Sequence, residues 1–238
     1  MMGKKQLRIL VVSILVFILS IIIINVISGR DSPKNEQILI EEKQEDIIRK
    51  EAEEKGLLIL VNKENPLNAD YKPDDLMPIR YYASDRSSAC RYMRAEAAEQ
   101  FHKLVEAAEK EGYTIVMTTA YRSYGFQKIL WDQYVAKEGE EAAAKYSARP
   151  GTSEHQTGLA VDITSPGVDY KLLNSFGQTE EGIWIAKNAH RFGFIIRFPK
   201  GKEEITGYQY EPWHLRYVGE ASATEIYRQG LTLEEYLQ

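Results

Sequence analysis

The sequence predicts an α+β fold, in which helices flank a mainly antiparallel sheet. Two kinds of segment, and their order along the chain, predict this class. Amphipathic segments with helical spacing lie before and after several short segments with the composition of strands. Helices that stand before and after separated strands are typical of α+β domains.

The predicted helices have regular apolar spacing. Apolar residues recur at helical intervals from Ala97 to Ala108, and Gly112 closes this helix. A second helix is expected over about residues 126–137, and a short one follows over residues 141–145. His102 lies one position off the apolar face of the first helix, so we expect it to be solvated.

Four segments read as strands. In the last of them, alternation places His214 and Arg216 on one face and the intervening Leu215 on the other. The four are Tyr113–Thr119, Leu159–Ile163, Phe194–Phe198 and Trp213–Val218.

Size and composition restrict the function. The 238 residues have room for one large domain or two small ones. The 30 basic and 35 acidic residues are well mixed and give a net charge of −5, so we expect no nucleic-acid partner. Cys90 is the only cysteine, which rules out an intrachain disulfide and a thiolate metal cluster.

An apolar block near the N-terminus predicts a membrane anchor. Lys4, Lys5 and Arg8 precede Ile9–Ile27, which contains no charged residue. A helix of that length spans roughly 28 Å, about the hydrocarbon thickness of a bilayer. The basic flank favours a cytoplasmic N-terminus. The chain is therefore expected at the cell membrane as a single-pass protein whose catalytic domain is extracytoplasmic.

Two alternative interpretations of this block are disfavoured. A cleaved signal peptide is disfavoured because the apolar region is long and no Ala-x-Ala site follows it. A buried core helix is disfavoured by the unbroken run of Ile, Val and Leu. The expected organisation is a cytoplasmic tail with a transmembrane helix over residues 1–28, a charged linker with a solvated helix over 29–56, and the zinc domain over 57–238.

The segment Ser153-Glu-His155-Gln-Thr-Gly158-Leu-Ala-Val-Asp162 offers an imidazole and a carboxylate. A turn at Gly158 would let both side chains converge, whereas a continuous strand would hold them about 23 Å apart. Asp162 lies within an apolar strand, and a buried carboxylate there needs a metal or a cation as its partner. The alternative is that His155 caps a turn and Asp162 pairs with an arginine.

The segment Glu211-Pro-Trp-His214-Leu-Arg216 adds a second imidazole and a second carboxylate. Pro212 and the alternation that follows argue against a helix, so we expect Glu211 at a bend just before the strand. The alternative is a surface glutamate in a turn and a core histidine.

Together these residues predict a metallohydrolase. His155, Asp162 and His214 would bind Zn²⁺ and leave its fourth position open for water, as in catalytic zinc sites. Glu211 would then take a proton from that water.

The two segments resemble those of D-alanyl-D-alanine carboxypeptidases of the VanY and LdcB type, zinc peptidases that trim peptidoglycan stem peptides. The resemblance spans roughly residues 57–237. It includes Ala120-Tyr-Arg122-Ser-Tyr, Tyr146-Ser-Ala-Arg149-Pro-Gly-Thr and Phe194-Ile-Ile-Arg197-Phe198-Pro-Lys-Gly. It implies His155, Asp162 and His214 as zinc ligands and Glu211 as the general base that then protonates the leaving amine.

The resemblance also implies residues that contact the substrate. Arg122 matches an arginine that polarises the scissile carbonyl, a role suited to a fixed guanidinium. Gln127 and Ser153 match residues at the substrate's C-terminal end, although a helix-surface glutamine and a turn serine are the alternative readings. Many relatives have Tyr where this chain has Phe198, and we expect the missing hydroxyl to weaken or alter recognition of the terminal carboxylate.

The sequence thus predicts an enzyme that releases C-terminal D-Ala from stem peptides in cell-wall maturation, with the L,D bond slightly favoured over the D,D bond. Two alternatives stay open. One is an endopeptidase on the same scaffold, and the other is a metal-bearing binding module without catalysis. Glu211 and Arg122 argue against the binding module, because a binder needs neither a base nor an oxyanion donor.

Overall fold

A computed structural model describes residues 33–83, 87–144 and 147–238 of the chain. The chain divides into two units, Met1–Lys50 and Glu51–Gln238, and each is described by itself. The predicted transmembrane segment Ile9–Ile27 lies outside the described residues. Among the residues that are described, no helix is both long and apolar enough to cross a membrane.

Helix α2 (Pro33–Glu54) occupies most of the charged segment in which a solvated helix was expected. Most of its described side chains between Lys43 and Glu54 are exposed or half-buried, in keeping with their charge. Ala52 is the exception, because it is buried in the core of the second unit. The predicted boundary of the zinc domain, at residues 56 and 57, stays a prediction.

The second unit is built on a four-stranded sheet with the strand order β3-β4-β6-β5. Its neighbouring strands are antiparallel, as the sequence predicts. The strands are β3 (Val116–Thr119), β4 (Ala160–Thr164), β5 (Phe194–Phe198) and β6 (Glu211–Tyr217). Strand β3 begins three residues later than predicted, because the Tyr113 N–H donates to the Ala108 carbonyl and closes the end of the preceding helix. A second sheet pairs β1 (Leu76–Pro78) with β2 (Tyr92–Arg94), which the sequence analysis did not predict.

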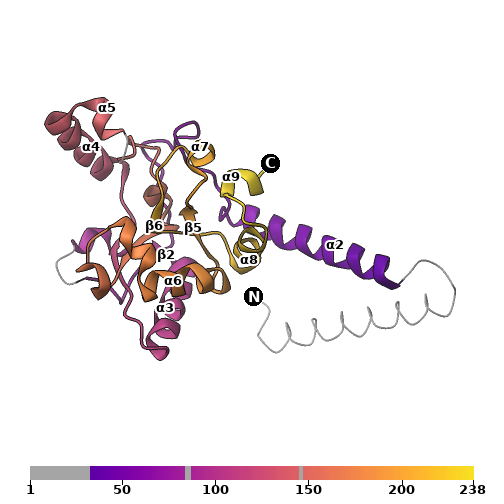
Figure 1. Cartoon of the computed structure of the whole chain (residues 1–238). Coiled ribbons are helices and arrows are strands. Elements are labelled where there is room, and N and C mark those ends of the chain that lie inside the picture. Colours follow the sequence, from indigo (N-terminus) through magenta and orange to yellow (C-terminus); the bar gives the residue numbers. More distant parts are fainter. Residues whose placement is uncertain (1–32, 84–86, 145–146) are drawn as a thin grey trace. The chain divides into compact units, whose positions relative to one another are not determined.

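One face of the larger sheet packs on helix α3 (Ala95–Lys110), which lies below the strands in Figure 1. The Phe101 ring of α3 lies 6.2 Å from that of Phe194, which lies 5.2 Å from the Tyr217 ring. His102 is not solvated as predicted. It is buried, and its Nε2 accepts a hydrogen bond from the Arg80 N–H at 3.1 Å.

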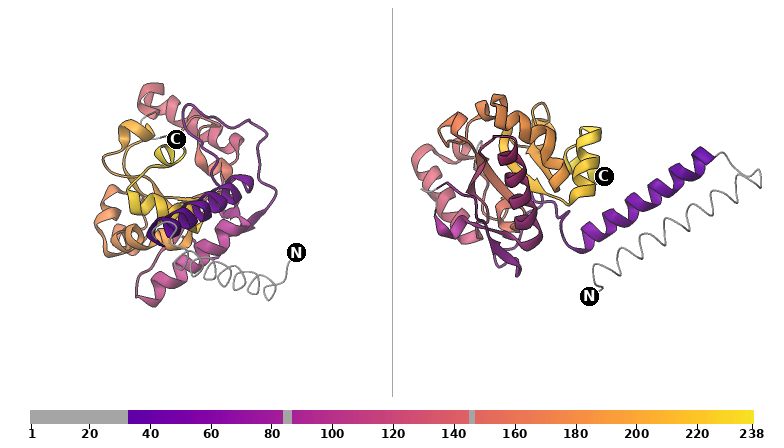
Figure 2. Two further views of the ribbon diagram at one scale, coloured as in Figure 1. Left: turned by 90° about the vertical axis from the view of Figure 1, so that its right-hand side faces the viewer. Right: turned by 90° about the horizontal axis from the view of Figure 1, so that it is seen from below.

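Of the remaining helices, α8 contacts β5 and α6 contacts β6, whereas α4 and α5 contact each other. The C-terminal pair α8 and α9, yellow in Figure 2, lies against the segment that carries β5, and Glu234 of α9 is bonded to Arg197 of β5. These helices are α4 (Tyr124–Glu138), α5 (Glu140–Ala143), α6 (Glu180–Asn188), α7 (Glu203–Thr206), α8 (Glu220–Gln229) and α9 (Leu233–Tyr236), with the short 3₁₀ helices η2 (Glu154–Thr157) and η5 (Ala189–Phe192) among the connections.

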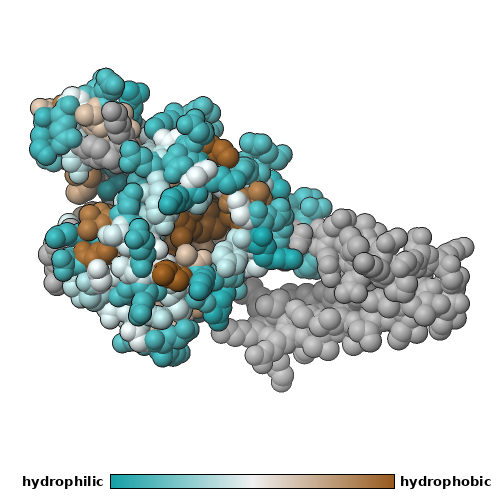
Figure 3. All heavy atoms as spheres, in the orientation of Figure 1, coloured by the Kyte–Doolittle hydropathy of each residue, from teal (hydrophilic) through white to brown (hydrophobic). Residues whose placement is uncertain are grey.

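The surface in Figure 3 is mostly hydrophilic and is interrupted by a hydrophobic hollow near its centre. An apolar cavity of about 240 Å³ lies between η5, β5 and α8, where Ile195, Ile196 and Leu231 line it. None of the site residues predicted from the sequence lines this cavity. Those residues lie around a separate pocket.

Candidate active site and metal centre

A left-handed turn brings His155 to Asp162, as predicted. Gly158 ends η2 with φ +68°, a conformation that glycine adopts without strain. A Cβ at this position would lie only 3.0 Å from Leu76 Cδ2 and 3.2 Å from Arg94 Cγ. The chain therefore reverses tightly here, and His155 Nε2 comes to lie 3.2 Å from Asp162 Oδ2.

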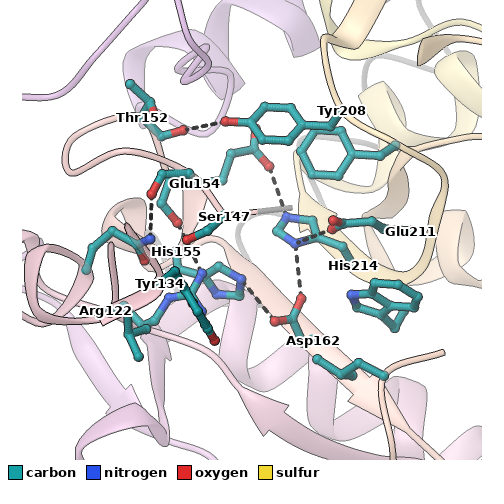
Figure 4. Close-up of a pocket in the computed structure, with 17 residues that line it drawn as sticks. Arg122, Tyr134, Ser147, Thr152, Glu154, His155, Asp162, Tyr208, Glu211 and His214 are labelled. Atoms are coloured by element: carbon teal, nitrogen blue, oxygen red, sulfur yellow. Dashed lines mark hydrogen bonds and ion pairs between the residues drawn. The ribbon is translucent and has the colours of Figure 1, made fainter. Parts of the chain in front are cut away.

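Strand pairing brings the third predicted ligand to the same point. Asp162 of β4 lies directly opposite His214 of β6, and Asp162 Oδ1 is 3.0 Å from His214 Nδ1. The two imidazole rings are 4.9 Å apart and nearly perpendicular. One ligand atom from each of the three residues lies within 4.8 Å of the others, and Figure 4 shows the side chains converging.

These three residues fit a metal ion. Asp162 Oδ1 is buried and accepts no hydrogen bond despite its approach to His214, which leaves it available to a cation. The second nitrogen of each imidazole is occupied: His155 Nδ1 lies 2.7 Å from the Ala120 carbonyl, and His214 Nε2 lies 3.4 Å from Glu154 Oε2. Because these partners occupy one nitrogen of each ring, the other nitrogens, His155 Nε2 and His214 Nδ1, are the ones that face the metal site. Outer hydrogen-bond partners orient metal-binding histidines in this way.

The electrostatics of the three side chains favour a cation. Burial and the neighbouring Arg122 lower the pKa of His155 to about 4, so this imidazole is neutral. Burial opposes the charge on Asp162, but His155 and His214 outweigh it and hold its pKa below the usual range. Burial likewise opposes a charge on His214, yet the neighbouring carboxylates of Asp162 and Glu154 raise its pKa to about 9. Metal binding at this histidine therefore displaces a proton.

Glu211 reaches the site by a route that differs from the prediction. It is the first residue of β6 rather than part of a bend before the strand. The register with β5 shifts between the pairs Ile196↔Leu215 and Phe198↔Glu211, so β6 bulges between Leu215 and Glu211. This bulge, and not a preceding bend, frees Glu211 from the alternation of the strand. Its Oε2 lies 3.9 Å from His214 Nδ1.

The environment of Glu211 suits proton transfer. Burial raises the pKa of Glu211 to about 7, and the attraction of His214 and Arg122 only partly offsets the effect of burial and of Asp162. A carboxylate with a pKa near neutrality can both accept and return a proton at physiological pH.

Arg122 and Ser153 lie together on the other side of the pocket. Arg122 follows β3 in the loop before α4, and its backbone N–H donates to the His155 carbonyl at 3.1 Å. Its Nη2 donates to Ser153 Oγ at 3.3 Å, while its buried Nε has no hydrogen-bond partner among the residues that the structure describes. The guanidinium is thus tied to the metal-binding loop and keeps a free donor.

Gln127 and Phe198 complete the set of predicted residues around a cavity of about 210 Å³. Gln127 is buried rather than on a helix surface. Its Nε2 donates to the Ala148 carbonyl at 2.7 Å, and its buried Oε1 has no partner. The Phe198 ring lies 4.9 Å from the His214 ring and 4.7 Å from that of Tyr208, which lines the same cavity. Sequence reasoning assigned nothing to Tyr208.

Sequence reasoning also missed Glu154, although it stands between two predicted site residues. Its carboxylate is buried beside His214 and accepts hydrogen bonds from Arg197 and Arg216. The available signal was the pair of arginines within otherwise apolar strands, since buried guanidinium groups require a buried anion.

Comparisons with known proteins identify the family of the chain. The family model described as VanY, D-alanyl-D-alanine carboxypeptidase, matches residues 90–220. The Bacillus subtilis protein YodJ is 47% identical over 184 residues, which are 77% of this chain and 67% of that protein.

Two solved structures are similar in fold and sequence. The LdcB LD-carboxypeptidase has a TM-score of 0.72 and 47% identity, and the match covers 75% of this chain and 84% of that one. The D,D-pentapeptidase VanY in complex with Zn(II) has a TM-score of 0.64 and 38% identity, with coverage of 76% and 99%.

Proposed function

This chain belongs to the VanY family of D-alanyl-D-alanine carboxypeptidases and is a zinc carboxypeptidase, and from that premise we propose that it releases one C-terminal D-Ala from peptidoglycan stem peptides in cell-wall maturation. The observation that carries this proposal is the meeting of His155, Asp162 and His214 with Glu211 in one pocket. The L,D bond of a tetrapeptide is slightly favoured over the D,D bond of a pentapeptide, because the similarity to the LD-carboxypeptidase LdcB exceeds that to VanY.

His155 Nε2, an Asp162 oxygen and His214 Nδ1 would hold the zinc ion, which when bound would act as a Lewis acid and lower the pKa of water to about 7. Glu211 takes a proton from the attacking water as the hydroxyl adds to the scissile carbonyl carbon. The C–N bond then breaks, and Glu211 returns the proton to the amine of the departing D-Ala. Its pKa near 7 suits both steps.

Arg122 stabilises the charge that develops on the carbonyl oxygen. Its guanidinium donates to Ser153 and its backbone N–H donates to the His155 carbonyl, so the side chain is oriented before substrate binds. Gln127 and Ser153 line the same cavity and orient the terminal residue of the substrate. Phe198 forms an apolar wall beside His214.

The N-terminal segment gives the proposed location. We propose that Ile9–Ile27 anchors the chain as a single span and that the zinc domain lies outside the cytoplasm, where peptidoglycan is found. Protease treatment of intact protoplasts is expected to remove the domain. A domain that survives this treatment and is cleaved only after lysis would contradict the location.

Mass spectrometry of digested stem peptides tests the activity. The zinc-loaded chain is incubated with tetrapeptide and pentapeptide, each with a free and an amidated C-terminus. Loss of one D-Ala from the free peptides, with strongly slowed cleavage of the amides, is the expected result. Equal rates on free and amidated peptides would indicate an endopeptidase, and intact peptides with zinc-loaded protein would indicate a binding module.

A further inference from the structure

The buried carboxylate of Glu154 connects the proposed zinc ligands to a second layer of charged residues, which consists of Arg197, Arg216 and Glu234. Its Oε2 faces His214 Nε2 at 3.4 Å. Its Oε1 accepts hydrogen bonds from Arg197 Nε at 2.7 Å and from Arg216 Nη1 at 2.6 Å. One oxygen is thus held by two cations while the other is presented to a proposed zinc ligand.

The two arginines have no solvent exposure, yet their charged groups are hydrogen-bonded. Arg216 also donates from Nη2 to the carbonyls of Leu57 and Ile59, each at 2.8 Å, and from Nε to the Tyr217 carbonyl at 3.1 Å. Burial alone would raise the pKa of Glu154, but the two arginines outweigh it and hold the pKa below its usual range. The carboxylate is therefore an anion in a fixed position.

The layer continues into the C-terminal helix. Arg197 donates to both oxygens of Glu234 in α9, from Nη1 at 2.8 Å and from Nη2 at 2.5 Å. Such a bidentate pair fixes the plane of the guanidinium as well as its position. Two acids and two arginines balance in charge within this group.

We propose that Glu154 is a positioning residue that holds His214 in the orientation required for zinc, and that Glu234 of α9 supports it through Arg197. The hydrogen bond from His214 Nε2–H to Glu154 fixes the tautomer in which Nδ1 is free to bind the metal. Rotation of the His214 ring would break this hydrogen bond. The Phe198 ring packs against the side of the same imidazole and restrains it further. The inference rests on zinc binding at the proposed triad but not on the peptide bond that is cut.

The first test is the zinc affinity of Glu154→Gln in the full chain, measured by competition with a chelator. Loss of an outer partner of a metal-binding histidine typically weakens binding by about 10–100-fold, and the folded variant is expected in this range. The His214 Nε2–H signal in ¹⁵N NMR of the zinc form should also exchange with water at least about tenfold faster, because its acceptor has changed.

A second variant keeps the test decisive if Glu154→Gln fails to fold. Glu234→Gln leaves Glu154 in place and weakens only the support of Arg197. Lys202→Met is the matched control. It breaks a neighbouring ion pair, in which Lys202 lies 2.8 Å from Glu235 of α9. This pair does not reach the zinc site. We expect a several-fold loss of zinc affinity for Glu234→Gln and a change of less than about twofold for Lys202→Met.

A folded Glu154→Gln protein with wild-type zinc affinity and Nε2–H exchange would overturn the role of Glu154. Equal zinc affinities for Glu234→Gln and Lys202→Met would overturn the role of the C-terminal helix. Both measurements are made without peptide. A chain that behaves as expected here but releases no D-Ala would refute the proposed function and leave this inference standing.

Discussion

Asp162 and His214 face each other across the central pair of strands, in register, with Asp162 Oδ1 3.0 Å from His214 Nδ1. Two segments about fifty residues apart thereby contribute ligands to one point without any loop rearrangement. The third ligand, His155, comes from the turn that enters β4. A site built largely on paired strands is rigid, which is what preorganised metal binding requires.

Replacing His155 with alanine is expected to abolish zinc binding. The two remaining ligands cannot hold the ion as tightly as three, so the zinc content should fall from about one ion per chain to near zero. Elemental analysis of the purified protein measures this. His190→Gln is the control, since His190 stacks on Tyr227 away from the site and its variant should keep its zinc. Unchanged zinc in His155→Ala would refute the ligand assignment.

Glu211→Gln is expected to retain zinc and lose turnover. The amide has the shape of the carboxylate but cannot accept the proton, and loss of a general base typically costs about 10²–10⁴-fold in kcat. Single-turnover kinetics and metal analysis of the same sample check both parts. If zinc is lost together with activity, Glu211 is a ligand and the division of roles proposed here is wrong.

The pH dependence of kcat/KM should show an acidic limb that belongs to Glu211. Its pKa is about 7, and a base acts only when it is deprotonated, so activity rises with pH up to this value. A bound dication lowers the pKa, so the observed midpoint should lie between about 4.5 and 7. The profile from pH 4 to 9 measures it. If the residual activity of Glu211→Gln shows the same acidic limb, the limb belongs to the titration of another side chain.

Arg122→Lys should lower kcat/KM by about 10²–10³-fold, the range found when one oxyanion donor is removed. Lysine keeps the charge but cannot donate to Ser153 and to the substrate from one fixed plane. Zinc content should not change, because Arg122 contributes no ligand atom. A rate close to that of the wild type would show that the charge alone suffices.

Gly158→Ala should destabilise the fold and loosen the ligand loop. The left-handed backbone costs an L-residue about 1–2 kcal/mol, and the added Cβ would approach Leu76 Cδ2 to 3.0 Å. Chemical denaturation should show a loss of at least that size in the free energy of unfolding. Gly112→Ala is a useful comparison, since its φ is +89° but no atom lies within 4 Å of the added Cβ.

Local patterns predicted much of this site. The glycine turn and the strand that follows are short-range features, so His155 and Asp162 could be brought together from the sequence, and the antiparallel sheet followed from the strand and helix signals. The bulge in β6 could not be predicted, because it depends on the register with β5. The burial of Gln127 and of His102 depends on packing against distant segments, which periodicity within one helix does not reveal.

The charged layer behind His214 was missed for a related reason. Arg197, Arg216 and Glu234 come from three elements, and only the tertiary fold shows that they share one buried acid. Arginines inside apolar strands indicate that a buried anion is needed, but they do not indicate which residue supplies it.

X-ray diffraction at the zinc absorption edge tests the central claim most directly. In crystals of the zinc-loaded protein, we expect one anomalous peak within about 2.0–2.2 Å of His155 Nε2, an Asp162 oxygen and His214 Nδ1, with Glu211 outside the coordination sphere. A peak elsewhere in the molecule, or one that Glu211 ligates directly, would contradict the account.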